Sequence, residues 1–305
     1  MQLRLQAPTP LVAITLDPAL PPIWTKLEFL NPSGSTKDRI ARFILEKAWR
    51  QGRINARTTV VEASSGSTSI AMALACAQLG IRFIAVMPEG VSNERVLIIK
   101  AYGGEIRFAP KDGGIEGAIR ITDQIAAEDP TVFLPRQFSN TDNAQAHRFL
   151  TAREIIDEIP SGRADAVVSG VGTGGTLVGL YEGLCDAGCQ PTPVFARPVN
   201  FTRESDVECC SFSCRIPGVV ECVSTIFNPA NLPALETFEV PDSEALSTTR
   251  ELMRRGFPVG PSSGLNYRAA QLYLAAHPGR DLIVVTVFPD RMERYFTTDL
   301  FQPFR

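Results

Sequence analysis

Short runs of β-branched and aromatic residues alternate along the chain with longer segments whose apolar residues recur every three or four positions. The first pattern predicts strands and the second predicts amphipathic helices. Strands are expected at residues 58–63, 82–87, 105–109, 166–170, 193–196, 236–240 and 282–288. Helices are expected at residues 37–52, 67–79, 92–102, 114–128, 141–158, 174–187, 242–255 and 264–277. This alternation predicts an α/β fold with mostly parallel sheets and helices on both faces.

The segment 198–233 departs from this alternation, because it is irregular and contains several proline and cysteine residues. A connection of this length is typical of a functional loop. The segment holds four of the seven cysteines, namely Cys209, Cys210, Cys214 and Cys222. Their spacing lacks the C-x-x-C pairs usual in metal and iron–sulfur sites, so we expect no bound metal. Reduced thiols are favoured, with a redox role of Cys209 or Cys210 and a metal site as alternatives.

Composition excludes several classes of protein. A chain of 305 residues is long enough for two domains with cores, and 44% hydrophobic with 21% charged residues is ordinary for a globular protein. A net charge of −3 gives no electrostatic signal for nucleic acid or an anionic membrane. Neither a membrane-spanning window nor a secretory signal core is recognised, so a cytoplasmic location is expected.

The chain contains two histidines, His147 and His277. This argues against histidine-rich metal sites and leaves few options for a Ser–His or Cys–His nucleophile. Catalysis is therefore expected to rely on a bound organic cofactor.

A single lysine follows a turn-rich stretch and opens a predicted helix in "NPSGSTKDRIARFILEKAW", residues 31–49. Lys37 is placed in the first helical turn, where the helix dipole and the unpaired N–H groups disfavour a cation. A lysine that must lose its proton to act as an amine nucleophile suits this position. Taken alone, the position is also compatible with an ordinary solvated lysine.

Two loops rich in glycine, serine and threonine join strands to helices. In "VVEASSGSTSIAMA", residues 60–73, small hydroxyl residues and helix N–H groups can bind a carboxylate, although an ordinary helix cap is an alternative. In "VVSGVGTGGTLVGL", residues 167–180, glycines and threonines form a potential phosphate cradle. This second loop matches neither the P-loop nor the Rossmann motif, which favours a phosphate that does not belong to a nucleotide.

A third loop, "GPSSG" at residues 260–264, also precedes a helix. A lysine amine, a phosphate cradle, a carboxylate-binding loop and a further hydroxyl would together hold pyridoxal 5'-phosphate and an amino acid. In that arrangement Lys37 would form the Schiff base and the cofactor would act as the electron sink.

The chain resembles the fold-type II pyridoxal-phosphate enzymes, in particular the cysteine synthase and cystathionine β-synthase group. The resemblance rests on motifs in the family's order over nearly the whole chain: "TPLVAI", "KLEFLNPSGSTKDRIA", "EASSGSTSIAMA", "QFSNTDNAQAH", "GVGTGGT", "GPSSG" and "FPDRMERYFTTDLF". It implies the two-domain, tryptophan-synthase-β-like form of the α/β fold. It also replaces the solvated reading of Lys37 with that of the Schiff-base lysine, which in the family shuttles the α-proton.

The resemblance assigns roles to residues of this sequence. The residues implied to bind the cofactor are Lys37, Ser67, Gly172, Thr173, Gly174, Gly175, Thr176 and Ser262. The residues implied to bind the substrate carboxylate are Ser64, Ser65, Thr68 and Gln137. Ser262 would face the pyridine nitrogen, and a neutral hydroxyl there favours prompt loss of a β-substituent over transamination.

The resemblance also implies a domain organisation. Residues 40–147 would form a smaller mobile domain that carries the carboxylate-binding loop, and residues 1–39 with 148–305 would form the larger cofactor-binding domain. Closure of the smaller domain would exclude water from a reactive aminoacrylate intermediate. Members of the family are typically homodimers, so a homodimer is expected.

Several positions depart from the family pattern, and three of them bear on the site. The carboxylate loop usually reads T-S-G-N-T-G, whereas here Ser67 replaces the asparagine that contacts the ring oxygen of the cofactor, and Ser69 replaces the last glycine. Near the C-terminus, "PDRMERY" places Arg291 where the family has a small residue, either as a charge near the cofactor or as an exposed side chain. These changes leave the identity of the substrate open.

The resemblance implies a transferase or lyase that acts on an activated L-serine. O-acetylserine or O-phosphoserine would lose its β-substituent, and sulfide would add to the aminoacrylate to give L-cysteine. Alternatives with the same elimination chemistry are cysteine desulfhydration and the synthesis of cystathionine or a specialised amino acid. A non-catalytic homologue and a metal or redox sensor built on the cysteine cluster are the other classes considered.

Overall fold

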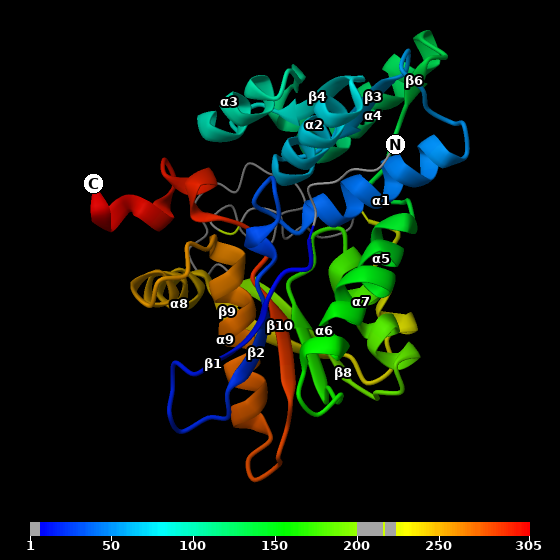
Figure 1. The fold of residues 1–305 in the computed structure, drawn as a ribbon. Coiled ribbons are helices and arrows are strands. Elements are labelled where there is room, and N and C mark those ends of the chain that lie inside the picture. Colours follow the sequence, from blue (N-terminus) through cyan, green and yellow to red (C-terminus); the bar gives the residue numbers. More distant parts are fainter. Residues whose placement is uncertain (1–6, 200–215, 217–223) are drawn as a thin grey trace.

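The computed structural model describes residues 7–199, 216 and 224–305 as two sheets with helices packed around them (Figure 1). All pairings within the sheets are parallel except β1 with β2, so the predicted α/β class with mostly parallel sheets is confirmed. Among the described residues, no helix combines the length and the apolar character needed to cross a membrane. The cysteine cluster at residues 209–222 lies outside the described residues.

The larger sheet has six strands in the order β1-β2-β10-β7-β8-β9. Its strands are β1 (Leu11–Ile14), β2 (Ile23–Lys26), β7 (Ala166–Ser169), β8 (Thr192–Val199), β9 (Glu236–Pro241) and β10 (Val284–Val287). β7 and β10 are buried along their whole length, as expected for parallel strands covered on both faces.

The smaller sheet has four strands in the order β5-β4-β3-β6. Its strands are β3 (Thr59–Ala63), β4 (Arg82–Pro88), β5 (Glu105–Ala109) and β6 (Val132–Phe133). Every residue of β3 is buried, and the β-branched residues at positions 58–61 are those that predicted this strand.

The helices follow the predicted pattern closely. They are α1 (Lys37–Arg50), α2 (Ser67–Leu79), α3 (Asn93–Ala101), α4 (Gly114–Glu128), α5 (Asp142–Ala146), α6 (Ala152–Glu158), α7 (Gly175–Asp186), α8 (Asp242–Arg254) and α9 (Pro261–Ala276). The helix predicted at 141–158 contains a π-helical turn, η3 (His147–Thr151), between α5 and α6. Strands β1, β2 and β6 were not predicted.

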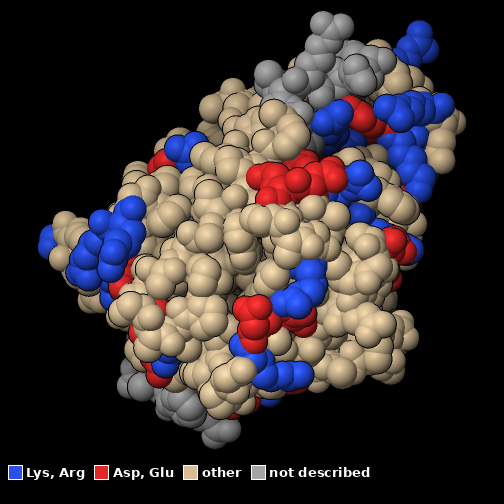
Figure 2. Space-filling view, turned by 60° about the horizontal axis from the view of Figure 1, so that its bottom comes forward, with Lys and Arg blue, Asp and Glu red and all other residues tan. Residues whose placement is uncertain are grey.

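The apolar cores divide along the chain. One large cluster of buried side chains and a second smaller one draw all their members from residues 40–146. Two other clusters draw theirs from residues 11–29 and 152–288. Helix α1 lies between the two groups of elements in Figure 1, and its first residue is Lys37. Acidic and basic side chains are interspersed on the face of the molecule drawn in Figure 2.

Candidate active site

Lys37 begins α1, as predicted, and lines a cavity between the two sheets. The turn before it is tied to the segment after β10, because the Thr36 N–H donates to the carbonyl of Pro289 at 2.8 Å and Ser35 forms a β-bridge with Asp290. Burial lowers the pKa of the Lys37 amine, while the carboxylates of Asp290 and Glu28 act in the opposite direction. A depressed pKa raises the fraction of neutral amine available as a nucleophile.

The loop after β3 is shaped by its own serines. The Ser64 hydroxyl oxygen accepts hydrogen bonds from the backbone N–H groups of Gly66 at 2.9 Å and Ser69 at 3.1 Å. Gly66 has a φ of +152°, and a Cβ on it would lie 2.3 Å from Cδ of Arg95, so glycine is required there. Ser65, Ser67 and the other predicted loop residues line the cavity.

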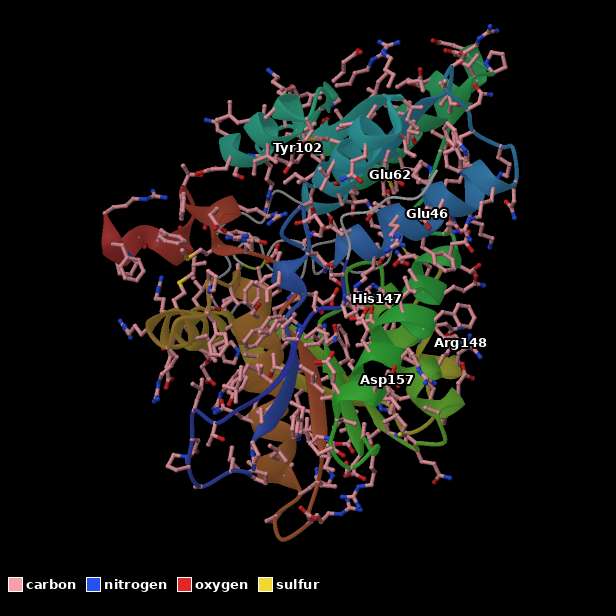
Figure 3. All side chains as sticks on the ribbon, in the orientation of Figure 1. Glu46, Glu62, Tyr102, His147, Arg148 and Asp157 are labelled. Atoms are coloured by element: carbon pink, nitrogen blue, oxygen red, sulfur yellow. The ribbon has the colours of Figure 1, made fainter. Side chains whose placement is uncertain are left out.

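Thr68 and Gln137 meet at the base of this loop, although they are far apart in sequence. The Thr68 hydroxyl donates to Oε1 of Gln137 at 2.6 Å, and the Gln137 amide donates to the carbonyl of Ala63 at 2.6 Å. Glu62, labelled in Figure 3, precedes Ala63 on β3, and its carboxylate accepts hydrogen bonds from the backbone N–H groups of Ala63 and Gln137. Burial raises the pKa of Glu62 to about 8, although these hydrogen bonds act against the increase.

The loop after β7, predicted as an anion cradle, turns sharply into the start of α7. Gly174 adopts a φ of +80° just before α7, so the backbone turns sharply and presents the first-turn N–H groups of the helix. The Asn143 side-chain amide donates to Oγ1 of Thr173 at 2.9 Å, which leaves the hydroxyl proton of Thr173 free for the cavity. Gly172, Thr173, Gly174 and Thr176 line the cavity.

Gly175 is the one predicted site residue that does not line the cavity. A Cβ on Gly175 would lie 2.0 Å from Oδ1 of Asn143, so this glycine allows α7 to pack against the segment that holds the cradle. Ser262 is the second residue of α9 and lines the cavity together with Asn266. The segments that bear Lys37, the carboxylate loop, the cradle and Ser262 therefore surround a single space.

Several residues of the cavity were missed by the sequence analysis, notably Arg95, Asp290 and Tyr295. Asp290 is 6% exposed, and its Oδ1 has no partner among the described residues. The Ser67 hydroxyl donates to the other oxygen, Oδ2, at 3.3 Å. The sequence signal for Asp290 and Tyr295 was the "PDRMERY" motif at residues 289–295, in which only Arg291 attracted attention, whereas no motif indicated Arg95.

Arg291 itself does not line the cavity. Its side chain is 43% exposed and pairs with Glu293 at 3.0 Å. Of the two readings offered by the sequence, the exposed side chain is the one the structure supports. Within the described ranges, no group of His, Cys, Asp and Glu side chains is arranged to hold a metal ion, and Cys76, Cys185 and Cys189 are free thiols.

The residues of this cavity fit pyridoxal phosphate. A lysine amine with a depressed pKa suits an aldehyde, and a loop with a left-handed glycine and the hydroxyl of Thr173 suits a phosphate. The unpartnered Oδ1 of Asp290 and Nε of Arg95 are buried polar atoms at the cavity that a polar ligand would satisfy. Fold and cavity thus place a buried lysine amine beside a glycine-rich loop at a helix N-terminus in an α/β protein.

Comparison with known proteins gives the family. The model of the pyridoxal-phosphate dependent enzyme family matches residues 3–290, and the chain belongs to this family. Cysteine synthase B of Campylobacter jejuni is 38% identical over 280 residues, which are 92% of this chain and 91% of that protein.

Two solved structures share the fold over most of their length. A hydrogen sulfide-producing enzyme from Fusobacterium nucleatum has a TM-score of 0.87 at 33% identity, covering 98% of this chain and 90% of that chain. An O-acetylserine dependent cystathionine β-synthase from Helicobacter pylori has a TM-score of 0.84 at 30% identity, covering 97% and 96%. The fold-type II class expected from the sequence is therefore confirmed, and pyridoxal phosphate is the cofactor of the family.

Proposed function

We propose that this enzyme carries out β-replacement on an activated L-serine, taking O-acetylserine or O-phosphoserine and sulfide to L-cysteine. The β-substituent leaves with its bonding electron pair, and sulfide forms the new carbon–sulfur bond. The observation that carries the proposal is that Lys37, the carboxylate loop and the anion cradle line one cavity. The names of the relatives, cysteine synthase B and an O-acetylserine dependent synthase, support the choice of substrate.

Each group of residues has a distinct task in this proposal. The amine of Lys37 would hold the cofactor aldehyde and afterwards accept the proton of the substrate α-carbon. Residues 172–176 would bind the phosphate, and Ser262 would face the ring nitrogen. Ser64, Ser65, Thr68 and Gln137 would bind the substrate carboxylate; Ser64 and the Thr68–Gln137 pair also hold the shape of the loop.

When bound, the cofactor supplies an electron sink for the α-carbon of the substrate. The hydroxyl of Ser262 is neutral, so it would not hold the ring nitrogen in its protonated form as a carboxylate would. This favours expulsion of the β-substituent over transamination.

We further propose that residues 40–147 form a mobile unit that closes over the substrate and excludes water. The separation of the apolar cores into residues 40–146 and the remainder supports this division. Small-angle scattering with and without O-acetylserine measures the closure, and identical profiles would contradict it.

A second function with the same chemistry is release of sulfide from cysteine, or synthesis of cystathionine or a specialised amino acid. Two structural neighbours, a hydrogen sulfide-producing enzyme and a cystathionine β-synthase, support this second function. So does Ser67, which replaces the asparagine usual at this point of the loop.

The deciding experiment exposes the purified holoenzyme separately to O-acetylserine, O-phosphoserine, serine and cysteine while the cofactor absorbance is recorded. Sulfide is then added and L-cysteine is quantified. We expect an absorbance change with an O-substituted serine and cysteine formation after sulfide. Sulfide release from cysteine as the fastest reaction would establish the second function, and no change with any amino acid would contradict both.

A homodimer in the cytoplasm completes the proposal. The dimer is supported by the resemblance to a family of typically dimeric enzymes, and the location is supported by the free thiols of Cys76, Cys185 and Cys189. Nucleic acids and membranes are not expected as partners, in view of the net charge of −3. Sedimentation analysis of the purified holoenzyme tests the dimer.

A further inference from the structure

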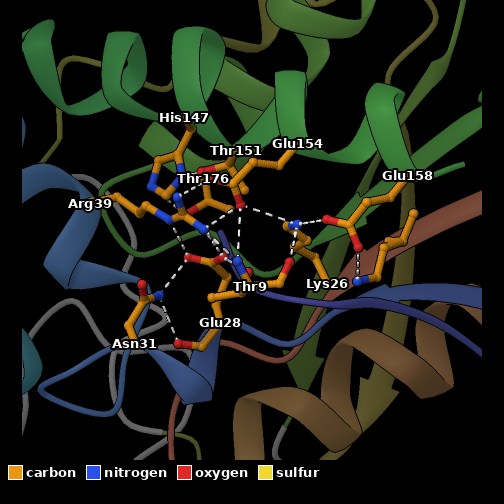
Figure 4. Close-up of polar contacts among 11 residues, drawn as sticks. Thr9, Lys26, Glu28, Asn31, Arg39, His147, Thr151, Glu154, Glu158 and Thr176 are labelled. Atoms are coloured by element: carbon orange, nitrogen blue, oxygen red, sulfur yellow. Dashed lines mark hydrogen bonds and ion pairs between the residues drawn. The ribbon is translucent and has the colours of Figure 1, made fainter. Parts of the chain in front are cut away.

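Two networks of buried polar side chains lie near the first turns of α1 and α2. In the network drawn in Figure 4, the guanidinium of Arg39 pairs with Glu28 at 2.8 Å and with Glu154, so the charges satisfy one another. The other network consists of two serine hydroxyls, those of Ser64 and Ser69, which are 2% and 0% exposed. Ser64 lines the cavity and Ser69 lies behind it, so this second network ends at the cavity.

The hydroxyl oxygen of Ser64 is surrounded by hydrogen-bonding groups. It accepts from the backbone N–H groups of Gly66 at 2.9 Å and Ser69 at 3.1 Å, and it lies 3.0 Å from Oγ of Ser69. Either Ser69 donates to Ser64 and the Ser64 proton points into the cavity, or Ser64 donates to Ser69. The direction of this one hydroxyl contact therefore decides whether Ser64 offers the cavity a donor.

The surroundings of Ser69 fix that direction. Within the described part of the chain, Ser64 is the one partner of the Ser69 hydroxyl. A serine in a helix can instead donate to the carbonyl four residues earlier, but here the carbonyl of Ser65 accepts from Nη1 of Arg95 at 3.1 Å. If Ser64 donated to Ser69, the proton of the fully buried Ser69 hydroxyl would have no acceptor, which is unfavourable. Ser69 is therefore the donor, and the Ser64 proton faces the cavity.

A carboxylate is the ligand that matches this arrangement. An ionised carboxylate only accepts hydrogen bonds, so it can bind the proton of the Ser64 hydroxyl but not its oxygen. Hydrogen bonds to a charged acceptor are stronger than those between neutral groups. The donors that converge on the Ser64 oxygen also polarise its O–H bond, which makes the hydroxyl a better donor to the carboxylate.

The two serines replace two other residues of the family pattern. The pattern T-S-G-N-T-G has threonine where this chain has Ser64 and glycine where it has Ser69. Threonine is stiff at χ1 because of its branched Cβ, whereas the serine side chain rotates more freely. The hydrogen bond from Ser69 restricts the same rotation, so the change at position 69 compensates for the change at position 64.

We propose that Ser69 is a positioning residue of the substrate site, whose hydroxyl donates to Oγ of Ser64 and thereby directs the Ser64 proton at the carboxylate of the amino-acid substrate. The inference rests on the proposed function, in which Ser64, Ser65, Thr68 and Gln137 bind that carboxylate. It makes the affinity for the substrate depend on a residue that does not touch the substrate.

Titration of the holoenzyme with L-serine and with L-alanine, followed by the absorbance of the bound cofactor, tests the proposal. L-alanine has the carboxylate but no β-substituent, so its binding is measured without elimination. Loss of one hydrogen bond predicts that S69A raises the dissociation constants of both amino acids about tenfold. T122V is the matched control, because it removes a buried hydroxyl of α4 that donates to the carbonyl of Ile119, away from the cavity. It should bind both amino acids as the wild type does.

Double variants separate positioning from a general effect on folding. S64T/S69G restores the threonine and glycine of the family pattern, so it should bind L-alanine as the wild type does, whereas S69G alone should be weakened like S69A. S64A/S69A should be no weaker than S64A, because without the Ser64 hydroxyl there is no proton to direct. With O-acetylserine and sulfide, S69A should raise KM and leave kcat unchanged, since the carboxylate is bound throughout the reaction.

Wild-type affinity in S69A, additive losses in S64A/S69A, or S64T/S69G as weak as S69G would overturn the positioning role. If neither amino acid changes the absorbance of the wild-type holoenzyme, the placement of the substrate carboxylate itself is contradicted. A wild-type response that S69A leaves unaltered contradicts the role of Ser69 alone. Urea unfolding of each holoenzyme accompanies the titrations, and if a double variant does not fold, the comparison of S69A with wild type and T122V still decides the question.

Discussion

The phenol of Tyr295 donates a 2.6 Å hydrogen bond to Oδ2 of Asp290, a buried carboxylate whose other oxygen has no partner in the described part of the chain. The guanidinium of Arg95 lies over the Tyr295 ring, 5.3 Å from its centroid, and donates to the carbonyl of Ser65 at 3.1 Å. The segment after β10 therefore connects the carboxylate loop to the charge that acts on Lys37. Arg95, Asp290 and Tyr295 thus link the loop after β3 to Lys37.

Replacement of Tyr295 by phenylalanine should lower kcat/KM about tenfold or more. The change removes a hydrogen bond to a charged group and leaves the Asp290 side chain, among the residues the structure describes, with the 3.3 Å contact to Ser67 alone. Steady-state kinetics and the absorbance of the bound cofactor measure the effect. Y102F, at the half-buried tyrosine after α3, is the matched control, and equal rates in the two variants would argue against a role for the Tyr295–Asp290 pair.

Replacement of Lys37 by arginine should abolish turnover, with a loss of about a thousandfold or more, because arginine keeps the charge but provides no amine nucleophile. Borohydride treatment of the wild-type holoenzyme, followed by peptide mapping, should place the cofactor on Lys37. K47R is the control in the same helix, since Lys47 is 40% exposed and pairs with Asp142. Label on any other lysine, or an active K37R, would contradict the assignment.

The elements predicted correctly are those whose burial leaves a local signature. β3 is buried on both faces and begins with a run of β-branched residues, and α1 shows a regular apolar stripe. β2 was missed because it is short and ends in Lys26, which is fully buried and paired with Glu158 at 2.6 Å. β6 has only two residues, which is below the length at which a pattern can be recognised.

The residues of the site likewise divide into those with a local sequence signature and those without one. Lys37 and the loops at 64–69 and 172–176 are local motifs, so the sequence indicates them directly. Arg95 and Tyr295 are 200 positions apart and meet only through the packing of α3 against the C-terminal segment, where the Ser92 hydroxyl also donates to the carbonyl of Arg294. No periodicity or spacing in the sequence reports such a contact.

Replacement of Ser67 by asparagine should change the absorbance of the bound cofactor or the preference among O-substituted serines. Ser67 lines the cavity and donates to Asp290, and asparagine reaches farther and adds a second donor. Spectra of the holoenzyme and kcat/KM for O-acetylserine and O-phosphoserine give the readout. An unchanged spectrum together with unchanged preference would remove Ser67 from the site.

Glu62 should make the enzyme less stable as the pH rises. Its pKa is about 8 in the folded chain against an ordinary value of 4.5, so the folded state holds more protons than the unfolded state between these values. The free energy of unfolding therefore falls with pH in this window, by up to about 1.4 kcal/mol per pH unit from this group.

The E62Q variant tests this dependence. In E62Q the free energy of unfolding, measured by chemical denaturation, should fall less steeply between pH 5 and pH 8 than in the wild type. Its stability should nevertheless be lower by about 1–3 kcal/mol at pH 5, because the glutamine amide cannot accept the second backbone N–H. E128Q, at an exposed residue of α4, controls for the loss of a carboxyl group, and equal slopes in wild type and E62Q would contradict the prediction.

Two glycine-to-alanine changes should have opposite effects on stability, because they differ in what the new methyl group meets. In G179A the Cβ would lie 2.2 Å from a backbone carbonyl of α5, so α7 must move away, at a cost of about 1–3 kcal/mol. In G117A the nearest atom, in the side chain of Arg120, is 3.7 Å away, so the better helix propensity of alanine should stabilise α4 by about 0.5–1 kcal/mol. Unfolding of both holoenzymes in urea compares them. The displaced α7 should also shift Thr176, which is in its first turn and lines the cavity, and so weaken cofactor binding in G179A alone. Equal cofactor affinities in the two variants would show that the loop at residues 172–176 does not depend on this packing.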